Sequence, residues 1–312
     1  MFKRKFICTM LSLAFLSSFM IEETSYAMDS SEIDNYYSYE FDSTEFPVLS
    51  EEETAAFFAD AKKAAEENIT PELLEEVEEI LNDLNISEET PANPNLRYVA
   101  SVDSISLEAA LDKHDGMSVS EIFKVGVTHA NNARDTAVES YTNLGSTVEM
   151  KRDAFRHSYW NFLSIQDVGE NATRIATINH EWVARILPDV QAYEEERYKY
   201  YSNMFAPGEG DAFSMAVSDA YAYAITYRDE LIKNCKESYA AFNVVFFNNA
   251  YIMDFWNNRV GRYYGKNNPD QSWLDLFPTV WNANKLIKHE GDDQVTTNRR
   301  ISVHRSNWWY IS

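Results

Sequence analysis

Cysteine is scarce in this sequence of 312 residues, which contains only Cys8 and Cys235. Cys8 lies in an N-terminal segment that we expect to be removed, so the mature protein keeps one thiol. An internal disulfide is then excluded, and the fold must be held together by packing. The aromatic content of 14% favours a packed core over disorder.

Long apolar runs are also lacking, apart from one at the N-terminus. The basic stretch Lys3–Lys5 precedes the largely apolar run Phe6–Met20, and Ser25 and Ala27 are small residues at the positions that a signal peptidase recognises. The alternative is a membrane anchor, but the run is shorter than the roughly 20 residues that a spanning helix needs. We therefore predict that residues 1–27 are a cleaved signal, that the protein is secreted or associated with the cell envelope, and that no transmembrane anchor remains.

Basic residues are outnumbered, because 27 Lys and Arg face 50 Asp and Glu and give a net charge of −23. Most of the excess lies in residues 28–95, which hold twenty acidic residues and two lysines. A protein this acidic has no electrostatic footprint for non-specific binding to DNA or RNA. The partner that we expect instead is a small-molecule or lipid-like substrate.

Residues 28–95 are predicted to form an acidic leader followed by a helical hairpin. Ser50 begins the first helix in capping-box style, and Thr70 with Pro71 begins the second. The pair is either a small interaction module or a solvated hairpin, and the leader is either solvated or a pro-segment that covers the site. Residues 96–312 follow as the main helical domain, after a linker rich in proline and asparagine.

Segments of strand period that alternate with helices are absent, which argues against an α/β fold. We predict an all-α, multi-helix bundle around a buried polar cavity, with a short β-hairpin within residues 294–312. The expected helices of the main domain cover residues 118–144, 147–167, 171–187, 190–205, 211–233 and 238–264.

Three of these helices carry polar residues where a core-facing stripe would be expected. The polar residues follow the i, i+3, i+4, i+7 spacing of one helix face and are flanked by apolar residues. They are Asp153, Arg156, His157, Trp160, Asn161 and Ser164 in the first helix, Thr173, Thr177, His180 and Glu181 in the second, and Asp254, Asn257, Asn258, Gly261 and Arg262 in the third. Buried charge is unfavourable unless it is paired or bound to a metal, so three such faces predict one shared polar cavity.

Each of these residues also has a structural explanation. His180 alone would be a hydrogen-bonded core histidine, and Asp254 with Arg262 would be an ion pair. Folding rarely requires so many buried polar groups together, because their replacement by apolar side chains is often neutral or stabilising. The combination therefore favours a functional site.

The order of these motifs resembles an uncharacterised bacterial domain family with the pattern D-A-[FL]-R-H-x-x-W, a later H-E, and D-x-x-N-N-x-x-G-R. This chain has Asp153–Trp160, His180-Glu181 and Asp254–Arg262 at the matching places, and the similarity covers roughly residues 151–264. Members of that family occur in exported proteins and as the terminal module of large secreted or toxin-like proteins. The resemblance implies export and supplies no established reaction.

The first of two mechanisms that fit these residues uses a metal ion. Asp153 and His157 stand at i and i+4 on one helix, so both can hold one ion, and His180 and Asp254 from the other helices complete the ligand set. A mixed imidazole and carboxylate shell suits Zn²⁺, Mn²⁺ or Fe²⁺.

The metal mechanism also gives roles to the residues around the ligands. Glu181 is the general base on metal-bound water, and Arg156 or Arg262 stabilises negative charge in the transition state. The supporting residues are Trp160, Asn257 and Asn258.

The second mechanism needs no metal. His157 or His180 is the general base, Asp254 or Glu181 orients it, and the arginines bind an anionic group. Both mechanisms lead to hydrolysis of a phosphoester or lipid-like ester. The sequence contains no G-x-S-x-G, H-E-x-x-H or Gly-rich phosphate loop, so a serine hydrolase, a zincin and a nucleotide fold have no motif support.

Two functions from other classes stand beside the hydrolase. One is a non-catalytic exported binding or envelope protein, in which the polar residues form a structural core. The other is a secreted effector or toxin module that acts in another cell.

Overall fold

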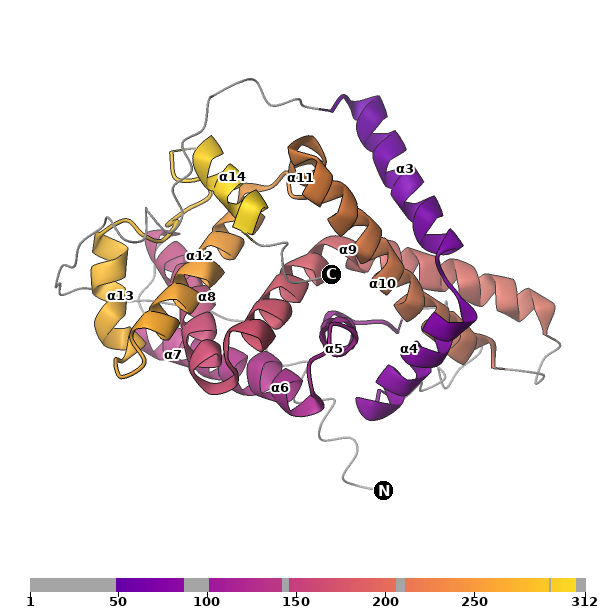
Figure 1. Cartoon of the computed structure of the whole chain (residues 1–312), viewed down its shortest axis with the longest axis horizontal. Helices are drawn as coiled ribbons and strands as arrows, with labels where there is room; N and C mark the ends of the chain where they lie inside the picture. Colours follow the sequence, from indigo (N-terminus) through magenta and orange to yellow (C-terminus); the bar gives the residue numbers. More distant parts are fainter. Residues whose placement is uncertain (1–48, 87–100, 142–145, 206–210, 292, 307–312) are drawn as a thin grey trace. The chain divides into compact units, whose positions relative to one another are not determined.

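The computed structural model describes residues 49–86, 101–141, 146–205, 211–291 and 293–306. These residues form helices and no β-strand, which confirms the predicted all-α fold (Figure 1). The predicted signal, the leader up to residue 48 and the linker lie outside the described residues. Among the helices that are described, none is both long and apolar enough to cross a membrane.

The chain divides into two compact units, each assembled from segments that are distant in sequence. Among the described residues, unit 1 is drawn from Ser120–Ile178 and Phe246–Ser312, and unit 2 from Phe46–Val119 and Asn179–Val245. The division falls at other places than the predicted boundary after residue 95, which itself lies outside the described residues.

Unit 1 is built on two long helices, α8 (Ser146–Val168) and α12 (Asn249–Asn267), which lie side by side (Figure 1). The π-helix η1 (Lys124–His129) and helix α7 (Ala130–Ser140) pack against α8, and α14 (Thr297–Ser306) packs against α12. The unit also contains α6 (Val119–Phe123), of which the residues from Ser120 onward belong to it, the start of α9 (Glu170–Met204), and α13 (Trp273–Asn282).

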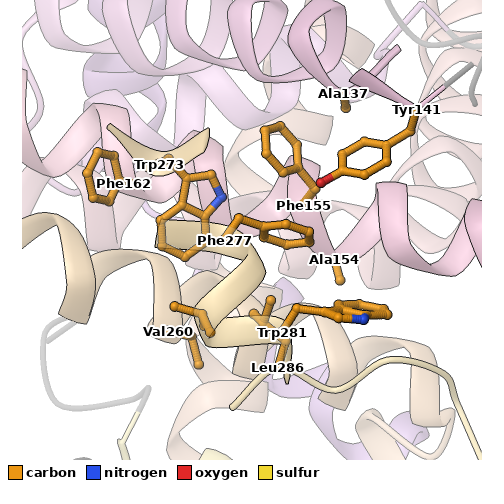
Figure 2. Close-up of a cluster of buried hydrophobic side chains, with 11 residues drawn as sticks. Ala137, Tyr141, Ala154, Phe155, Phe162, Val260, Trp273, Phe277, Trp281 and Leu286 are labelled. Atoms are coloured by element: carbon orange, nitrogen blue, oxygen red, sulfur yellow. The ribbon is translucent and has the colours of Figure 1, made fainter. Parts of the chain in front are cut away.

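An aromatic cluster covers one face of α8 (Figure 2). Phe155 of α8 makes edge-to-face contacts with Tyr141 and Phe277, with ring centroids 5.3 and 4.9 Å apart. Phe162, two turns later on the same face, contacts Trp273 at 5.2 Å. Full burial of such a ring contributes roughly 1.5–3 kcal/mol. This face therefore anchors α8, and the polar residues occupy the other side of the helix.

Unit 2 is built around α10 (Ala212–Glu237), against which four shorter helices pack. Ala216, Ala220 and Ala224 are fully buried at four-residue spacing along α10, so neighbouring helices can approach this face closely. The four shorter helices are α3 (Glu51–Glu67), α4 (Pro71–Asp83), α5 (Ser104–His114) and α11 (Tyr239–Val245), and the unit also contains the second part of α9.

The helix starts expected near the N-terminus are confirmed. Ser50 and Glu53 form a reciprocal capping box at the start of α3. Thr70 caps α4 with Pro71 at the first helical turn. Both helices pack on α10, so the acidic pair contributes to the core of unit 2.

The break predicted at Pro188 is wrong, because α9 continues through it from Glu170 to Met204. A proline inside a helix removes the N–H that would bond the carbonyl four residues earlier. Here that carbonyl belongs to Ala184, and both Ala184 and Pro188 are exposed. Water can bond the released carbonyl, so the helix tolerates the proline.

Two further predictions near the C-terminus are wrong. The single helix over residues 238–264 is interrupted, because α11 ends at Val245 and the Asn248 side chain caps a new helix by accepting from the amide of Ala250. The β-hairpin over residues 294–312 is replaced by α14, Thr297–Ser306, whose buried residues Ile301 and Val303 had been assigned to a strand. Residues 307–312 lie outside the described part.

Candidate metal centre

Helices α8 and α12 approach each other unusually closely, because α12 carries glycines at their contact. A Cβ on Gly261 would lie 2.0 Å from the carbonyl oxygen of Ser158, and one on Gly265 would lie 2.8 Å from that of Phe162. Real Cβ atoms do not come this close to backbone, so only glycine fits at either position. The close approach lets short polar side chains of the two helices meet directly.

The facing residues meet at three successive levels along the two helices. Asp153 faces Asp254 at the first level, His157 faces Asn258 at the second, and Asn161 faces Arg262 at the third. Each pair is separated by 101 residues in sequence, so the two helices run in the same direction. This pairing turns two i, i+4, i+8 stripes into one continuous polar strip.

Three ligand-bearing side chains come together at the first two levels. One atom each from Asp153, His157 and Asp254 lies within 4.8 Å of the others. His157 Nε2 is 3.4 Å from Asp254 Oδ1 and 3.6 Å from Asp153 Oδ1. Two ligands held about 2.1 Å from a tetrahedral ion are about 3.4 Å apart. The separations therefore fit an ion shared by the three side chains.

A relay of hydrogen bonds behind this group fixes the imidazole. Arg262 Nη1 donates to Asn161 Oδ1 at 2.7 Å and to Thr177 Oγ1 at 2.8 Å. Asn161 Nδ2 donates to Asn258 Oδ1 at 2.8 Å, and His157 Nδ1 lies 3.2 Å from the same oxygen. The relay crosses from α12 to α8 and back again, so both helices determine its geometry.

The polarity of the relay follows from its arginine, since a guanidinium can only donate. Asn161 must present its oxygen to Arg262 and hence its NH₂ group to Asn258. Asn258 then presents an oxygen to His157, whose Nδ1 must carry the proton. In the neutral imidazole the lone pair is left on Nε2, which faces both carboxylates. This is the tautomer that a metal ligand requires.

The centre is buried at its base and reaches solvent at its edge. The side chain of His157 is 5% exposed and that of Asp254 is 18% exposed, whereas Asp153 reaches 30% and Arg156 43%. Arg156 Nη2 donates to Asp153 Oδ1 at 2.5 Å and lies 3.0 Å from His157 Nε2. One cationic side chain thus lies at the solvent edge, in contact with two of the three ligand atoms.

Two of the predicted site residues lie in unit 2. His180 Nδ1 is 2.9 Å from a carboxylate oxygen of Glu108 on α5, and the group of candidate ligands contains Asp153, His157 and Asp254 without it. Glu181 is buried in unit 2. The predicted fourth ligand and general base are therefore not among the residues that unit 1 brings together.

Two of the supporting residues bind backbone instead of facing the ligands. Both amide atoms of Asn257 bond the backbone of Ile287, at 3.0 and 2.9 Å. Trp160 Nε1 donates to the carbonyl oxygen of Val125, inside the π-helix, at 2.8 Å. These contacts secure the segments around α8 and α12.

His129 forms a separate buried contact in unit 1. Its Nδ1 lies 3.1 Å from Ser164 Oγ, and its Nε2 lies 3.2 Å from Asp167 Oδ2. Burial lowers the pKa of His129, against the opposing effect of the Asp167 carboxylate. Its partners lie on the C-terminal turns of α8, beyond the three levels that hold the candidate ligands.

Three residues important to the geometry received no individual role from the sequence. Asn161 and Thr177 belong to the predicted polar faces, yet only the pairing of the helices shows that they hold Arg262 and His157. Gly261 appears in the motif, but only the structure shows why a glycine is needed there: the backbone carbonyl of Ser158 occupies the place of a Cβ.

Comparison with protein-family models, with curated proteins and with solved structures finds no match to this chain. The motif resemblance therefore stays a proposal, and the functional argument rests on the geometry of unit 1.

Proposed function

We propose that this protein is a metal-dependent hydrolase whose centre is formed by Asp153, His157 and Asp254. The observation that carries the proposal is the convergence of these three side chains, with the lone pair of His157 Nε2 held toward both carboxylates. The arrangement brings two carboxylates to the lone-pair side of one imidazole, and buried negative charges gathered in this way favour a bound cation.

The geometry favours the metal mechanism over a metal-free histidine base. A general-base histidine is oriented by a group at one nitrogen and takes a proton at the other. Here Nδ1 of His157 meets the neutral amide of Asn258, and both carboxylates lie on the Nε2 side. The orienting group is thus a neutral amide, which stabilises an imidazolium less than a carboxylate at Nδ1 would, and the two carboxylates are placed to share a cation with Nε2.

Three protein ligands leave positions open for water and substrate, as in catalytic sites. A divalent ion bound here would lower the pKa of a coordinated water to about 7 and so supply hydroxide at neutral pH. Asp153 and Asp254 would hold the ion, and the relay from Arg262 would keep His157 in the ligating tautomer. Arg156 is the exposed cation beside the ligands, which favours a phosphoester over an uncharged lipid-like ester.

We also propose that the protein acts outside the cytoplasm. The support is the N-terminal pattern of residues 1–27 and the motif resemblance to an exported family. N-terminal sequencing of protein exported by a bacterial host tests this, since cleavage after Ala27 leaves Met28 first. Full-length protein that stays in the cytoplasm would overturn the proposal, and an intact N-terminus on exported protein would overturn cleavage after Ala27.

Metal titration and an activity assay on the purified protein test the hydrolase proposal. The protein is titrated with Zn²⁺, Mn²⁺ and Fe²⁺, and hydrolysis of a chromogenic phosphomonoester, phosphodiester and carboxylic ester is followed. We expect one ion per chain and metal-dependent phosphoester hydrolysis. H157A loses the ion, and D254N binds it at least about tenfold more weakly, while both variants stay folded.

The matched control is D275N, which removes a carboxylate from an exposed position on α13 of the same unit. Its metal binding should equal that of the wild type. Failure of the wild type to bind any of the three ions, or binding that persists in H157A, would overturn the proposal. A loss of roughly 3–5 kcal/mol in the unfolding free energy of H157A and D254N without metal binding would instead indicate a structural polar core.

A further inference from the structure

Arg156 takes up the metal-ligating lone pair of His157. Its Nη2 lies 3.0 Å from His157 Nε2 and 2.5 Å from Asp153 Oδ1, so one nitrogen contacts two of the three candidate ligand atoms. The relay from Arg262 places the imidazole proton on Nδ1, which leaves Nε2 as an acceptor toward the guanidinium. A neutral imidazole has one lone pair on that nitrogen. An arginine N–H and a metal ion cannot use it at the same time.

We propose that Arg156 is an internal competitor for the metal, which the ion displaces and which then binds the anionic group of the substrate. The inference rests on the proposed function, because it concerns the same three ligands. The ion would take the lone pair of Nε2 and an oxygen of Asp153, and the two contacts of Arg156 to these atoms would be given up.

The position of Arg156 allows this movement. Its side chain is 43% exposed and lies at the solvent edge of the centre, in contrast to the 5% exposure of His157. A guanidinium released at that edge keeps its charge and its planar set of donors. Such a group binds phosphate oxygens in a bidentate manner, which identifies the substrate class as a phosphoester.

Arg156 also balances negative charge both without the ion and with it. Without the ion, Arg156 offsets part of the negative charge of Asp153 and Asp254. With the ion in place, the ligands are neutralised by the metal and the arginine is left for a second anion. The positive side chain at the solvent edge is therefore available to a second anion only after the site has been loaded.

Affinity measurements on an Arg156 variant test the proposal. Zn²⁺ affinity is measured by competition with a chromophoric chelator for the wild type, R156A and R134A. The last variant is the matched control, because Arg134 is a partly exposed arginine of unit 1 that bonds the neighbouring Asp135. Inorganic phosphate is then titrated into each Zn²⁺-loaded protein, and thermal melting confirms that all three are folded.

We expect R156A to bind Zn²⁺ at least about tenfold more tightly than the wild type, because the competing hydrogen bonds to charged groups are gone. We expect its Zn²⁺-loaded form to bind phosphate at least about tenfold more weakly, and R134A to match the wild type in both measurements. Equal or weaker Zn²⁺ binding by R156A overturns this inference and leaves the hydrolase proposal standing. Unchanged phosphate binding overturns the substrate-binding role. Absence of Zn²⁺ binding in all three proteins overturns the proposed function together with this inference.

Discussion

The two units each contain a buried arginine that donates to an asparagine, which in turn donates to a second acceptor. In unit 1 the order is Arg262, Asn161 and Asn258. In unit 2, Arg228 Nη1 donates to Asn179 Oδ1 at 3.0 Å, and Asn179 Nδ2 donates to Asp112 Oδ1 at 3.0 Å. The same two-step relay is thus built twice, on different helices.

The relays differ in what lies at their ends. Arg228 has a fully buried side chain and holds both oxygens of Asp115, at 2.7 and 2.8 Å, so its charge is matched within the relay. Arg262 instead donates to the neutral Asn161 and Thr177. Its relay continues to an imidazole that faces two carboxylates at the edge of the centre.

Under the proposed function, this difference separates a structural polar network from one that binds a metal ion. A buried network whose charges are matched internally stabilises one arrangement of helices and leaves nothing to bind. A network that ends on an imidazole nitrogen facing two carboxylates, as at His157, still favours the binding of a cation from solution. The net charges of the two units differ as well. The segments Phe46–Val119 and Asn179–Val245 of unit 2 hold 10 basic and 29 acidic residues, whereas Ser120–Ile178 and Phe246–Ser312 of unit 1 hold 14 and 13.

The largest expected effect comes from removing the two arginines in turn. R228M should lower the unfolding free energy by about 3–5 kcal/mol, because it strands the buried carboxylate of Asp115. R262M strands the neutral Asn161 and Thr177 and should lower it by about 1–3 kcal/mol. Chemical denaturation of both variants measures the difference. Equal losses, or a larger loss in R262M, would mean that the two relays do not differ as described.

Closing the space between α8 and α12 should have the next largest effect. G261A places a methyl group against the carbonyl of Ser158, so we expect a loss of about 1–3 kcal/mol and weaker metal binding as Asp254 moves away from His157. G126A is the control, since a Cβ on this helical glycine meets no atom within 4 Å. There we expect a gain of about 0.5–1 kcal/mol. Wild-type stability and metal affinity in G261A would contradict the role given to the close approach.

The last prediction concerns the pH dependence of stability at the end of the relay in unit 2. Burial, with a contribution from Glu108, raises the pKa of Asp112 well above its usual value. The folded state therefore holds a proton that the unfolded state releases near pH 4, and this stabilisation is lost as pH rises above that value toward the raised pKa. D112N lacks the titration, so its stability relative to the wild type should increase with pH by about 1.4 kcal/mol per unit within this window.

Denaturant titrations of wild type and D112N from pH 4 to 8 measure that slope. A parallel pair of stability curves would show that Asp112 is ionised in the folded protein. Unit 2 would then contain an unmatched charge, and the contrast between the units would weaken.

The sequence was sufficient for the parts of the structure that depend on local spacing. The apolar period and the capping residues locate the helices, and the i, i+4 pairs Asp153–His157 and Asp254–Asn258 identify the side chains that share a face. Pro188 misled the prediction because a proline is tolerated where the released carbonyl faces water, and exposure is not visible in a local pattern.

The pairing of residues across helices could not be predicted in the same way. His180 has the right chemistry for a ligand, yet it contacts Glu108 in unit 2. Nothing in the spacing of the two residues indicates this. Likewise, Arg262 was expected to stabilise a transition state, whereas its bonds to Asn161 and Thr177 give it a positioning role. The register that sets Asp153 against Asp254 is fixed by glycines, and their purpose is evident only from the opposite backbone.

The separation of 101 residues between His157 and Asn258 has a consequence for the biogenesis of the protein. At a synthesis rate of about 5–20 residues per second, α8 leaves the ribosome roughly 5–20 seconds before its partner α12 exists. The metal ligands therefore cannot assemble on the nascent chain until most of the protein has been made. If the protein binds a metal and is exported unfolded, as proposed, this delay would keep the centre from trapping cytoplasmic metal before the chain has crossed the membrane.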